Sequence, residues 1–589
     1  MPVTVSYPGI YIQELPSSTH TITAAPTNIA VFIGYTHPLK TKPANWGKAV
    51  LIFGFADYQR EFGGFLRSTA YAFAGASQWI KDGTPVFASE VPHWDPENNS
   101  FGDMASAVNQ FFLNGGTQAY VVGLVPGSDP SQFAGGIAPP LSPPSVLGMT
   151  FTAREITDAN FVMTLTLRPI LPLGSPPGPF KADVIITYGP APQPGVGAPP
   201  GTITESYRGV TLTPPQLESP PVGTDPNFIE NRIGTADNPV SQLATVSAHT
   251  GPTLSDFQAL FPSMTWTFTT ASLQGSPPSF RNLFEGPDFT KVMQQDTDLD
   301  KVPIFNLMVI PGVTNSLVLS TAETFCENKR AFLIVDPPLT DSVDDSQLHF
   351  KHTIDKTVSE GTIPHSKNAA LYFPYLKSPD PLTGQSINLV TGSINEIPPS
   401  ATVAGVFAAT DVSRGVWKAP AGFQATTRNT TGVVERGKMT DQRQGLLNPI
   451  GVDCLRDFPN IGTAVFGART TVTLTDEQWR YVPVRRMALF LEQTFYATLG
   501  WVVFEPNDEP LWSAIRMSIN AFMLGLFRQG AFQGKTPSEA FKVSCDSQTT
   551  TQTDINNGIV NIVVGFAPLK PAEFVIITIS QLAGQTQTS

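Results

Sequence analysis

Short, continuous runs of apolar residues recur through the first two thirds of the chain, each bounded by Gly, Pro or Asp. Continuous runs of this length are typical of strands buried on both faces of a sheet. Between the third and fourth runs, residues 314–329 carry Leu317, Thr321 and Phe325 at helical spacing. A strand, a helix and a second strand in that order predict a parallel βαβ unit. The runs are residues 28–34, 119–125, 303–310, 331–336 and 369–376.

A proline-rich region interrupts this pattern at residues 129–289, which hold about half of the 55 prolines. Proline lacks an amide donor and fixes φ, so the region cannot be rich in helix. Alternating segments remain at residues 161–167 and 182–188. We therefore expect a small inserted β domain with long loops, facing outward.

After residue 430 the pattern becomes helical. Residues 484–497 and 512–528 each place apolar side chains on one stripe, which predicts two amphipathic helices packed on a sheet. Candidate strands of that sheet are residues 501–504, 540–545, 558–564 and 574–579. Helices and strands in this order predict an α+β domain.

Both chain ends carry short β-like segments with nothing of their own to pack on. Ordering such a segment costs about 1 to 2 kcal/mol per residue, so it needs apolar burial against a sheet. That sheet belongs either to the same chain or, by β-augmentation, to a neighbouring copy. The residues concerned are Gly9, Ile10, Tyr11, Ile12 and Gln13 at the start, and Phe574, Val575, Ile576, Ile577, Thr578 and Ile579 at the end.

Composition narrows the possible functions. The 589 residues predict roughly three or four folded units, and the net charge of −12 with no basic run argues against nucleic acid as a partner. Three cysteines far apart in sequence argue against a disulfide framework, so we expect folding in a reducing cytoplasm. Neither a secretion signal nor a membrane span is expected, and hence no direct membrane insertion.

Three motifs suggest chemistry, but none has the spacing of a known site. Residues 530–536 resemble a P-loop, yet the spacing of the glycines is one residue short and Pro537 follows; Thr536 and Glu539 fit a helical capping box better. His349 and His352, near Asp344 and Asp345, lack a third metal ligand at motif spacing. His365 and Ser366 lack an orienting acid, although triads assemble in space. We expect no catalytic residue, cofactor or metal; a hydrolase and a cell-surface binding module remain the alternatives.

Several sequence blocks, densest in the C-terminal third, together resemble one protein family. They are residues 6–14 (SYPGIYIQE), 28–34 (NIAVFIG), 111–116 (FFLNGG), 414–422 (RGVWKAPAG), 447–452 (LNPIGV), 467–470 (GART), 479–486 (WRYVPVRR), 504–512 (FEPNDEPLW) and 571–574 (PAEF). The combination resembles the contractile tail sheath proteins of myophages, R-type pyocins and extracellular contractile injection systems.

The resemblance implies a multidomain fold of α/β and α+β parts. An inner α+β domain would be built from both chain ends, a middle α/β domain would have a subtilisin-like topology, and the proline-rich β domain would be the outer insert. The expected boundaries are 1–25 for an N-terminal arm, 26–128 and 290–428 for the middle domain, 129–289 for the insert, 429–572 for the inner domain and 573–589 for a C-terminal strand arm.

The resemblance also implies how the protein acts. Six copies would form a ring, and rings would stack helically around an inner tube, with baseplate and cap or terminator proteins at the ends. The arms of neighbouring copies would complete one another's sheets at the terminal residues named above. Contraction would drive the tube through a target envelope. The particle would be assembled in the bacterial cytoplasm. We expect the cations Arg485, Arg486, Arg528 and Lys535 to include contacts to the tube.

Overall fold

The protein divides into two compact units, which are described separately. The C-terminal unit combines residues 1–25, 414–419 and 481–589, and the α/β unit combines residues 26–413 and 420–480. The computed structural model describes residues 21–577 apart from 38–39, 66–79, 82–83, 86–102, 125–148, 156–160, 171–178, 191–201, 215–224, 236–237, 249–257, 259–261, 269–285, 339–340, 344–353, 362, 380–394 and 473–474.

The α/β unit is built on one sheet with the strand order β19-β18-β14-β13-β12-β1-β5-β2. Every neighbouring pair from β18 to β5 is parallel, whereas β2 and β19 pair antiparallel at the two edges. The strands are β1 (Ala30–Tyr35), β2 (Ala49–Ile52), β5 (Ala119–Leu124), β12 (Leu307–Val309), β13 (Phe332–Val335), β14 (Ala369–Phe373), β18 (Val452–Phe458) and β19 (Gly462–Val465).

This sheet confirms all five strands predicted from apolar runs and the parallel pairing of β12 with β13 across the predicted helix. In chain order the parallel strands lie as second, first, third, fourth, fifth and sixth, which is a doubly wound order. The subtilisin-like topology implied by the resemblance stays a prediction.

Helices pack against this sheet and bury its apolar side chains. The helix α7 begins after the Asn315 cap, whose side chain accepts from the amides of Leu317 and Val318. In α9, residues 400–408 are all buried, which explains the continuous small and apolar sequence there. The helices are α1 (Phe55–Phe62), α2 (Asp103–Leu113), α6 (Gly286–Val292), α7 (Ser316–Lys329), α8 (Ile354–Ser359), α9 (Ser400–Arg414) and α10 (Asp441–Leu447).

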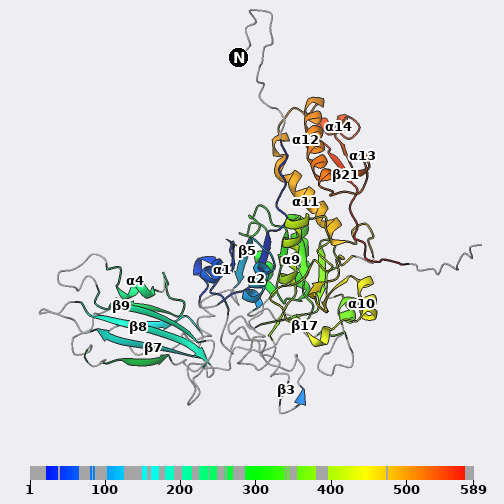
Figure 1. The fold of residues 1–589 in the computed structure, drawn as a ribbon. Coiled ribbons are helices and arrows are strands. Elements are labelled where there is room, and N and C mark those ends of the chain that lie inside the picture. Colours follow the sequence, from blue (N-terminus) through cyan, green and yellow to red (C-terminus); the bar gives the residue numbers. More distant parts are fainter. Residues whose placement is uncertain are drawn as a thin grey trace, which may run out of the picture. The chain divides into compact units, whose positions relative to one another are not determined.

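An inserted β region lies between β5 and β12. It has its own apolar core, formed by alternating residues of antiparallel strands, and Figure 1 shows β7, β8 and β9 as neighbouring arrows. The sheet orders are β11-β7-β8-β9 and β10-β6. The elements are β6 (Met149–Ala153), β7 (Phe161–Ile170), β8 (Lys181–Pro190), β9 (Ile203–Thr211), α4 (Ile229–Ile233), β10 (Ala244–Ala248) and β11 (Met264–Phe268).

Small elements complete the α/β unit. A three-stranded sheet has the order β16-β15-β17, and β3 pairs with β4. Their bounds are β3 (Ile80–Lys81), β4 (Thr84–Pro85), β15 (Leu376–Ser378), β16 (Asn395–Ile397), β17 (Gly432–Val433), η1 (Pro43–Asn45), η6 (Glu435–Gly437) and η7 (Asn448–Ile450).

In the C-terminal unit, two long helices share an apolar core with a small sheet; these elements are coloured orange to red in Figure 1. Both helices lie where the apolar stripes predict them. Asp508 caps the second helix by accepting from the amide of Glu509 at 2.7 Å. The elements are α11 (Val482–Thr498), η8 (Gly500–Val502), α12 (Glu509–Arg528), α13 (Pro537–Ala540), β20 (Phe541–Ser544), α14 (Gln552–Asn556) and β21 (Val563–Phe566).

Three expectations for the C-terminal third differ from the structure. Residues 429–480 lie in the α/β unit, because β18 extends the large sheet through parallel pairing with β14. Residues 501–504 form no strand; η8 ends at Val502, and Phe504 has a positive φ of 72° in the turn between two helices. The strand predicted at 558–564 is formed only at Val563–Phe566.

Candidate assembly site

The chain's C-terminal segment exposes a row of large apolar side chains. Phe574, Val575, Ile576 and Ile577 are 75%, 80%, 90% and 78% exposed. Residues 571–577 belong to no helix or strand, and in this part of the described chain no ladder partner pairs with them. Soluble proteins seldom leave four such residues in sequence uncovered, so the segment is a candidate for contact with another chain.

A short open sheet lies in the same unit. β20 pairs antiparallel with β21, from Phe541 opposite Phe566 to Ser544 opposite Val563. Phe541, Val543, Val564 and Phe566 pack on the core formed with α11 and α12. Among the described residues no third strand joins this sheet. An open edge of this kind presents amide and carbonyl groups to which a further strand can bind.

The beginning of the described chain is anchored in this unit as well. Ile22 is buried in the core with α11 and α12, and the amide of Ala25 donates to Oγ1 of Thr494 at 3.1 Å. The segment that precedes Ile22 is therefore attached to the C-terminal unit. Of the predicted strand-exchange residues, Gly9, Ile10, Tyr11, Ile12 and Gln13 lie outside the described residues, as do Thr578 and Ile579.

Only two of the four predicted tube-contact cations are accessible. Arg485 and Arg486, in the first turns of α11, are only 7% and 4% exposed, and Nη1 of Arg485 lies 3.2 Å from Oε1 of Glu492. Arg528 and Lys535 are exposed. We therefore correct the expectation for Arg485 and Arg486, whose guanidinium groups are buried within the chain.

The P-loop-like segment is a helix-to-helix turn. Its amides donate to protein oxygens: Gly530 to Phe527, Ala531 to Leu526 and Gln533 to Ala567. Thr536 is the N-cap of α13 with Pro537 following, as expected, but its side chain makes no cap hydrogen bond. The carboxylate of Glu539 accepts instead from the amide of Lys535 at 2.8 Å. These amides are committed to the fold and form no phosphate cradle.

His365 and Ser366 hold a loop against Thr471. Nδ1 of His365 lies 3.1 Å from the carbonyl oxygen of Thr471, and the amide of Ser366 donates to Oγ1 of Thr471 at 2.8 Å. The hydroxyl of Ser366 accepts from the amide of Asn368 at 3.0 Å in a buried site. Both side chains thus have structural roles, which gives the hydrolase alternative no support from this pair.

The candidate metal ligands of the sequence analysis are His349, His352, Asp344 and Asp345. All four lie outside the described residues. Within the described ranges no group of three or more His, Cys, Asp or Glu side chains has an arrangement that could hold a metal ion.

Among the described residues, no helix combines the length and the apolar character that crossing a membrane requires.

Two buried carboxyl groups follow the sheet strand β13. Asp336 accepts from Oγ of Ser400 at 2.6 Å and from the amides of Ser400 and Gly312 at 2.8 and 3.0 Å, and so caps α9. Burial raises the pKa of Asp336 to about 6, although these hydrogen bonds oppose the shift. Burial likewise raises the pKa of Asp341 to about 7. A raised pKa in the folded state makes a group's contribution to stability depend on pH, so we expect both carboxyl groups to do so here.

The block 504–512 has a structural explanation that sequence inspection did not supply. Nδ2 of Asn507 donates to the carbonyl oxygen of Ile559 at 3.0 Å, and Nε1 of Trp512 donates to Oδ1 of Asn507 at 2.9 Å. Asn507 thereby fastens the turn before α12 to the segment leading to β21. The block positions the small sheet against the helices.

Two family models match the chain in succession. Residues 296–471 match the phage tail sheath protein central domain, and residues 475–581 match the phage tail sheath C-terminal domain. A putative prophage major tail sheath protein of Pseudomonas aeruginosa (strain UCBPP-PA14) is 25% identical over 274 residues. That match covers 45% of this chain and 62% of the relative's length.

Solved sheath structures are similar to the chain over almost its whole length. The helical sheath of the anti-feeding prophage (AFP) in its contracted state aligns with 98% of this chain and 100% of that chain, at 20% identity and a TM-score of 0.50. The sheath of the extracellular contractile injection system PVC, also contracted, covers 98% and 99% at 20% identity and a TM-score of 0.49. The two sheath models together match residues 296–471 and 475–581, so this C-terminal part of the chain is similar to phage tail sheath proteins.

Proposed function

We propose that this chain is a structural sheath subunit that polymerises as stacked hexameric rings around an inner tube and contracts to drive the tube through a target envelope. The observation that carries the proposal is the exposed apolar segment 574–577 in the same unit as an open two-stranded sheet. The matches of residues 296–471 and 475–581 to the two sheath models support it. The polymer acts by a collective change of shape and needs no catalytic residue.

The C-terminal segment is proposed to add a strand to the small sheet of a neighbouring copy. The backbone amide and carbonyl groups of an extended segment can form hydrogen bonds with the unpaired groups along an open sheet edge. Burying a large apolar side chain stabilises by about 1.5 to 3 kcal/mol, more than the about 1 to 2 kcal/mol that fixing its backbone costs. Strand addition is therefore favourable when Phe574 to Ile577 are covered by the acceptor unit.

The N-terminal segment is proposed to act in the same way with a second neighbour. Residues 9–13 precede Ile22, which is anchored in the core of the C-terminal unit. A contact between different surfaces of identical copies generates a helix when its rotation does not close into a ring. Two such contacts per subunit would give a connected mesh.

Contraction is proposed to occur by rotation and outward sliding of subunits that stay joined through their arms. A small free-energy gain for each subunit is summed over the whole sheath, so no single contact has to be strong. The partners are then further copies of the chain, an inner tube, a baseplate and a cap or terminator. Assembly is proposed to take place in the bacterial cytoplasm before the particle acts.

Deleting residues 574–589 tests the arm. We expect the shortened chain to fold, because Phe574 to Ile577 are exposed and outside the core, but to form no long sheaths in negative-stain electron micrographs. Deleting only residues 585–589, the polar tail, is the matched control and should leave long sheaths. Normal long sheaths from the larger deletion would disprove the arm's role.

Paired substitutions refine the test. In a strand, alternate side chains face opposite sides of the sheet, and only one face of β20–β21 packs on the helices. Phe574→Ser with Ile576→Ser should therefore differ from Val575→Ser with Ile577→Ser, one pair abolishing polymerisation and the other weakening it less. Sheath lengths equal to the unmodified protein for both pairs would contradict strand addition.

A further inference from the structure

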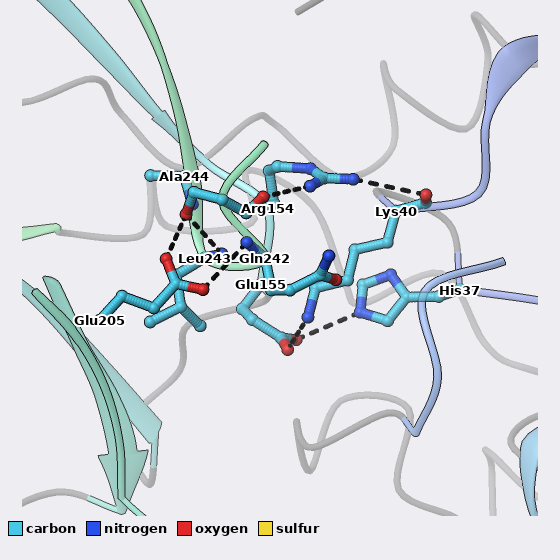
Figure 2. Close-up of polar contacts among 9 residues, drawn as sticks. His37, Lys40, Arg154, Glu155, Glu205, Gln242, Leu243 and Ala244 are labelled. Carbon is cyan, nitrogen blue, oxygen red and sulfur yellow. Dashed lines mark hydrogen bonds and ion pairs between the residues drawn. The ribbon is translucent and has the colours of Figure 1, made fainter. Parts of the chain in front are cut away.

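A buried cluster of charges lies where the inserted β region meets the large sheet. His37 and Lys40 follow β1 at the carboxyl edge of that sheet, and Arg154 and Glu155 follow β6, the first strand of the insert (Figure 2). The insert itself enters after β5, which pairs with β1. The four residues therefore connect two parts of the α/β unit that are separated by more than a hundred positions in sequence.

Glu155 is the centre of this cluster. Nε2 of His37 lies 3.1 Å from its Oε2, and the ammonium group of Lys40 pairs with its Oε1. The side chains of His37, Lys40 and Glu155 are 0%, 5% and 2% exposed. A buried carboxylate without such partners would be strongly unfavourable, so these contacts decide whether the junction holds.

The cluster continues into both sheets of the insert. The guanidinium group of Arg154 donates to the carbonyl oxygens of Ser241 and Lys40. Ser241 in turn hydrogen-bonds the carboxylate of Glu205 on β9, which also accepts from the amide of Gln242 at 3.0 Å. Movement of Glu155 away from Lys40 would thus be felt at β9 and β10.

The loop that carries His37 and Lys40 is fixed on its other side. Oγ1 of Thr41 donates to the carbonyl oxygen of His37 at 2.7 Å. Gly63, at φ +89°, leaves the space that Lys40 and His37 occupy: a Cβ there would lie 2.1 Å from Cβ of Lys40. The loop with His37 and Lys40 is therefore held by neighbouring residues of the part of the chain that forms the large sheet.

The protonation states follow from burial. Burial raises the pKa of Glu155, but Lys40 and the hydrogen bond from His37 outweigh it and hold that pKa at about 2. Burial lowers the pKa of His37 despite Glu155 beside it, and Lys40 and Arg154 add to the lowering. Near neutral pH, His37 is thus neutral, and Lys40 pairs with the Glu155 carboxylate. Protonating His37 would bury one more positive charge than this carboxylate balances.

We propose that Glu155, held by Lys40 and His37, is a latch that fixes the inserted β region to the large sheet, and that protonation of His37 opens it. The stabilisation that neutral His37 provides is fully present above pH 6.5 and is lost as the pH falls below that value. Once open, the insert moves as a folded body, because its own core does not include the cluster.

Hydrogen–deuterium exchange of the full chain tests this latch, with rates corrected for the intrinsic effect of pH. Between pH 7.5 and pH 5.0, exchange in peptides covering residues 30–42, 149–155 and 241–248 should rise at least tenfold, while β7 and β8 stay protected. Glu155→Gln should raise exchange at the junction at both pH values. Glu327→Gln, at an exposed position on α7, is the matched control and should leave it unchanged.

His37→Gln distinguishes a switch from a structural cluster. Glutamine retains an N–H donor for Glu155 but does not titrate, so the junction should stay protected at pH 5.0. If Glu155→Gln fails to fold, the double variant Lys40→Met with Glu155→Gln, which leaves no unpaired ammonium, must show the same loss of protection. An unchanged junction at pH 5.0, a pH response that survives His37→Gln, or equal loss of protection in β7 and β8 would overturn the proposal.

Discussion

At the residue scale, close contacts explain why Asn114 and Gly405 occupy their positions. The hydrophobic periodicity of the sequence does not reveal such contacts. In the block 111–116, Asn114 accepts from the amide of Arg428 at 2.7 Å and donates to its carbonyl oxygen at 3.3 Å. Gly405 of α9 lies directly against the same turn: a Cβ there would be 2.6 Å from Cβ of Asn114 and from the carbonyl oxygen of Phe111. The close crossing of α2 and α9 therefore requires glycine at position 405.

Gly405→Ala should destabilise the α/β unit by about 1 to 3 kcal/mol, because the added methyl group has to separate α2 from α9. Gly445→Ala is the matched control: in α10 an added Cβ meets nothing within 4 Å. There the helix propensity of alanine should stabilise by up to about 1 kcal/mol. Urea denaturation measures both, and equal effects of the two substitutions would refute the packing argument.

The buried carboxyl group of Asp341 should make stability depend on pH. The raised pKa means that its contribution is fully present below about 4 and is lost as the pH rises through about 7. Oδ2 of Asp341 accepts from the hydroxyl of Thr357, while Oδ1 finds no hydrogen-bond partner among the described residues. Ionisation would therefore leave a buried charge poorly compensated.

Asp341→Asn, which resembles the protonated acid, should remove this dependence. The difference in unfolding free energy between the original chain and the variant should fall with pH by at most about 1.4 kcal/mol per unit between pH 4 and 7. Urea denaturation at pH 5, 6, 7 and 8 checks the slope. Parallel pH profiles for the two proteins would contradict it.

At the scale of elements, the pattern of apolar residues predicted most strands of the large sheet and the two long helices of the C-terminal unit. Continuous apolar runs located β1, β5, β12, β13 and β14, and apolar stripes located α11 and α12, because burial on two faces or on one stripe leaves a direct trace in sequence. The apolar run at 501–504 misled for the same reason. These residues form a turn between two helices, in which Val503 and Phe504 are exposed. An apolar pattern of four residues does not distinguish such a turn from a strand.

The turn before α12 provides an element-scale prediction. Asn507→Ala removes the hydrogen bonds to Ile559 and Trp512, and it should destabilise the C-terminal unit by about 1 to 3 kcal/mol. Asn520→Ala, on the exposed side of α12, is the control and loses only a contact to the carbonyl oxygen of Arg516. A fluorescence-monitored denaturation curve that shifts equally for both variants would argue against an anchoring role for Asn507.

At the scale of the whole chain, amino-acid composition predicted the inserted β region. It did not predict where the α/β unit and the C-terminal unit divide. The proline-rich composition indicated a β region between β5 and β12, whereas the expected boundary at 429 missed β18 and β19. Strand pairing between β14 and β18 is a long-range property that local patterns do not contain. The charge cluster around Glu155 was missed for the same reason: its members are ordinary polar residues until the fold brings them together.

The accessible cations of the C-terminal unit lead to the prediction at the scale of the assembly. If Arg528 and Lys535 contact the inner tube, then Arg528→Glu with Lys535→Glu should leave sheath polymerisation intact but abolish co-assembly with the tube. Placing like charges opposite each other opposes association without disturbing a fold in which both side chains are exposed.

The same change of charge at Arg208 and Lys301, exposed in the α/β unit, is the control and should preserve co-assembly. Co-sedimentation of sheath and tube, followed by electron microscopy, separates loss of tube binding from loss of polymerisation. Salt adds a second criterion, because contacts between exposed charges weaken as ionic strength rises. Tube-filled sheaths from the reversed variant at low salt would show that the tube is held by other residues.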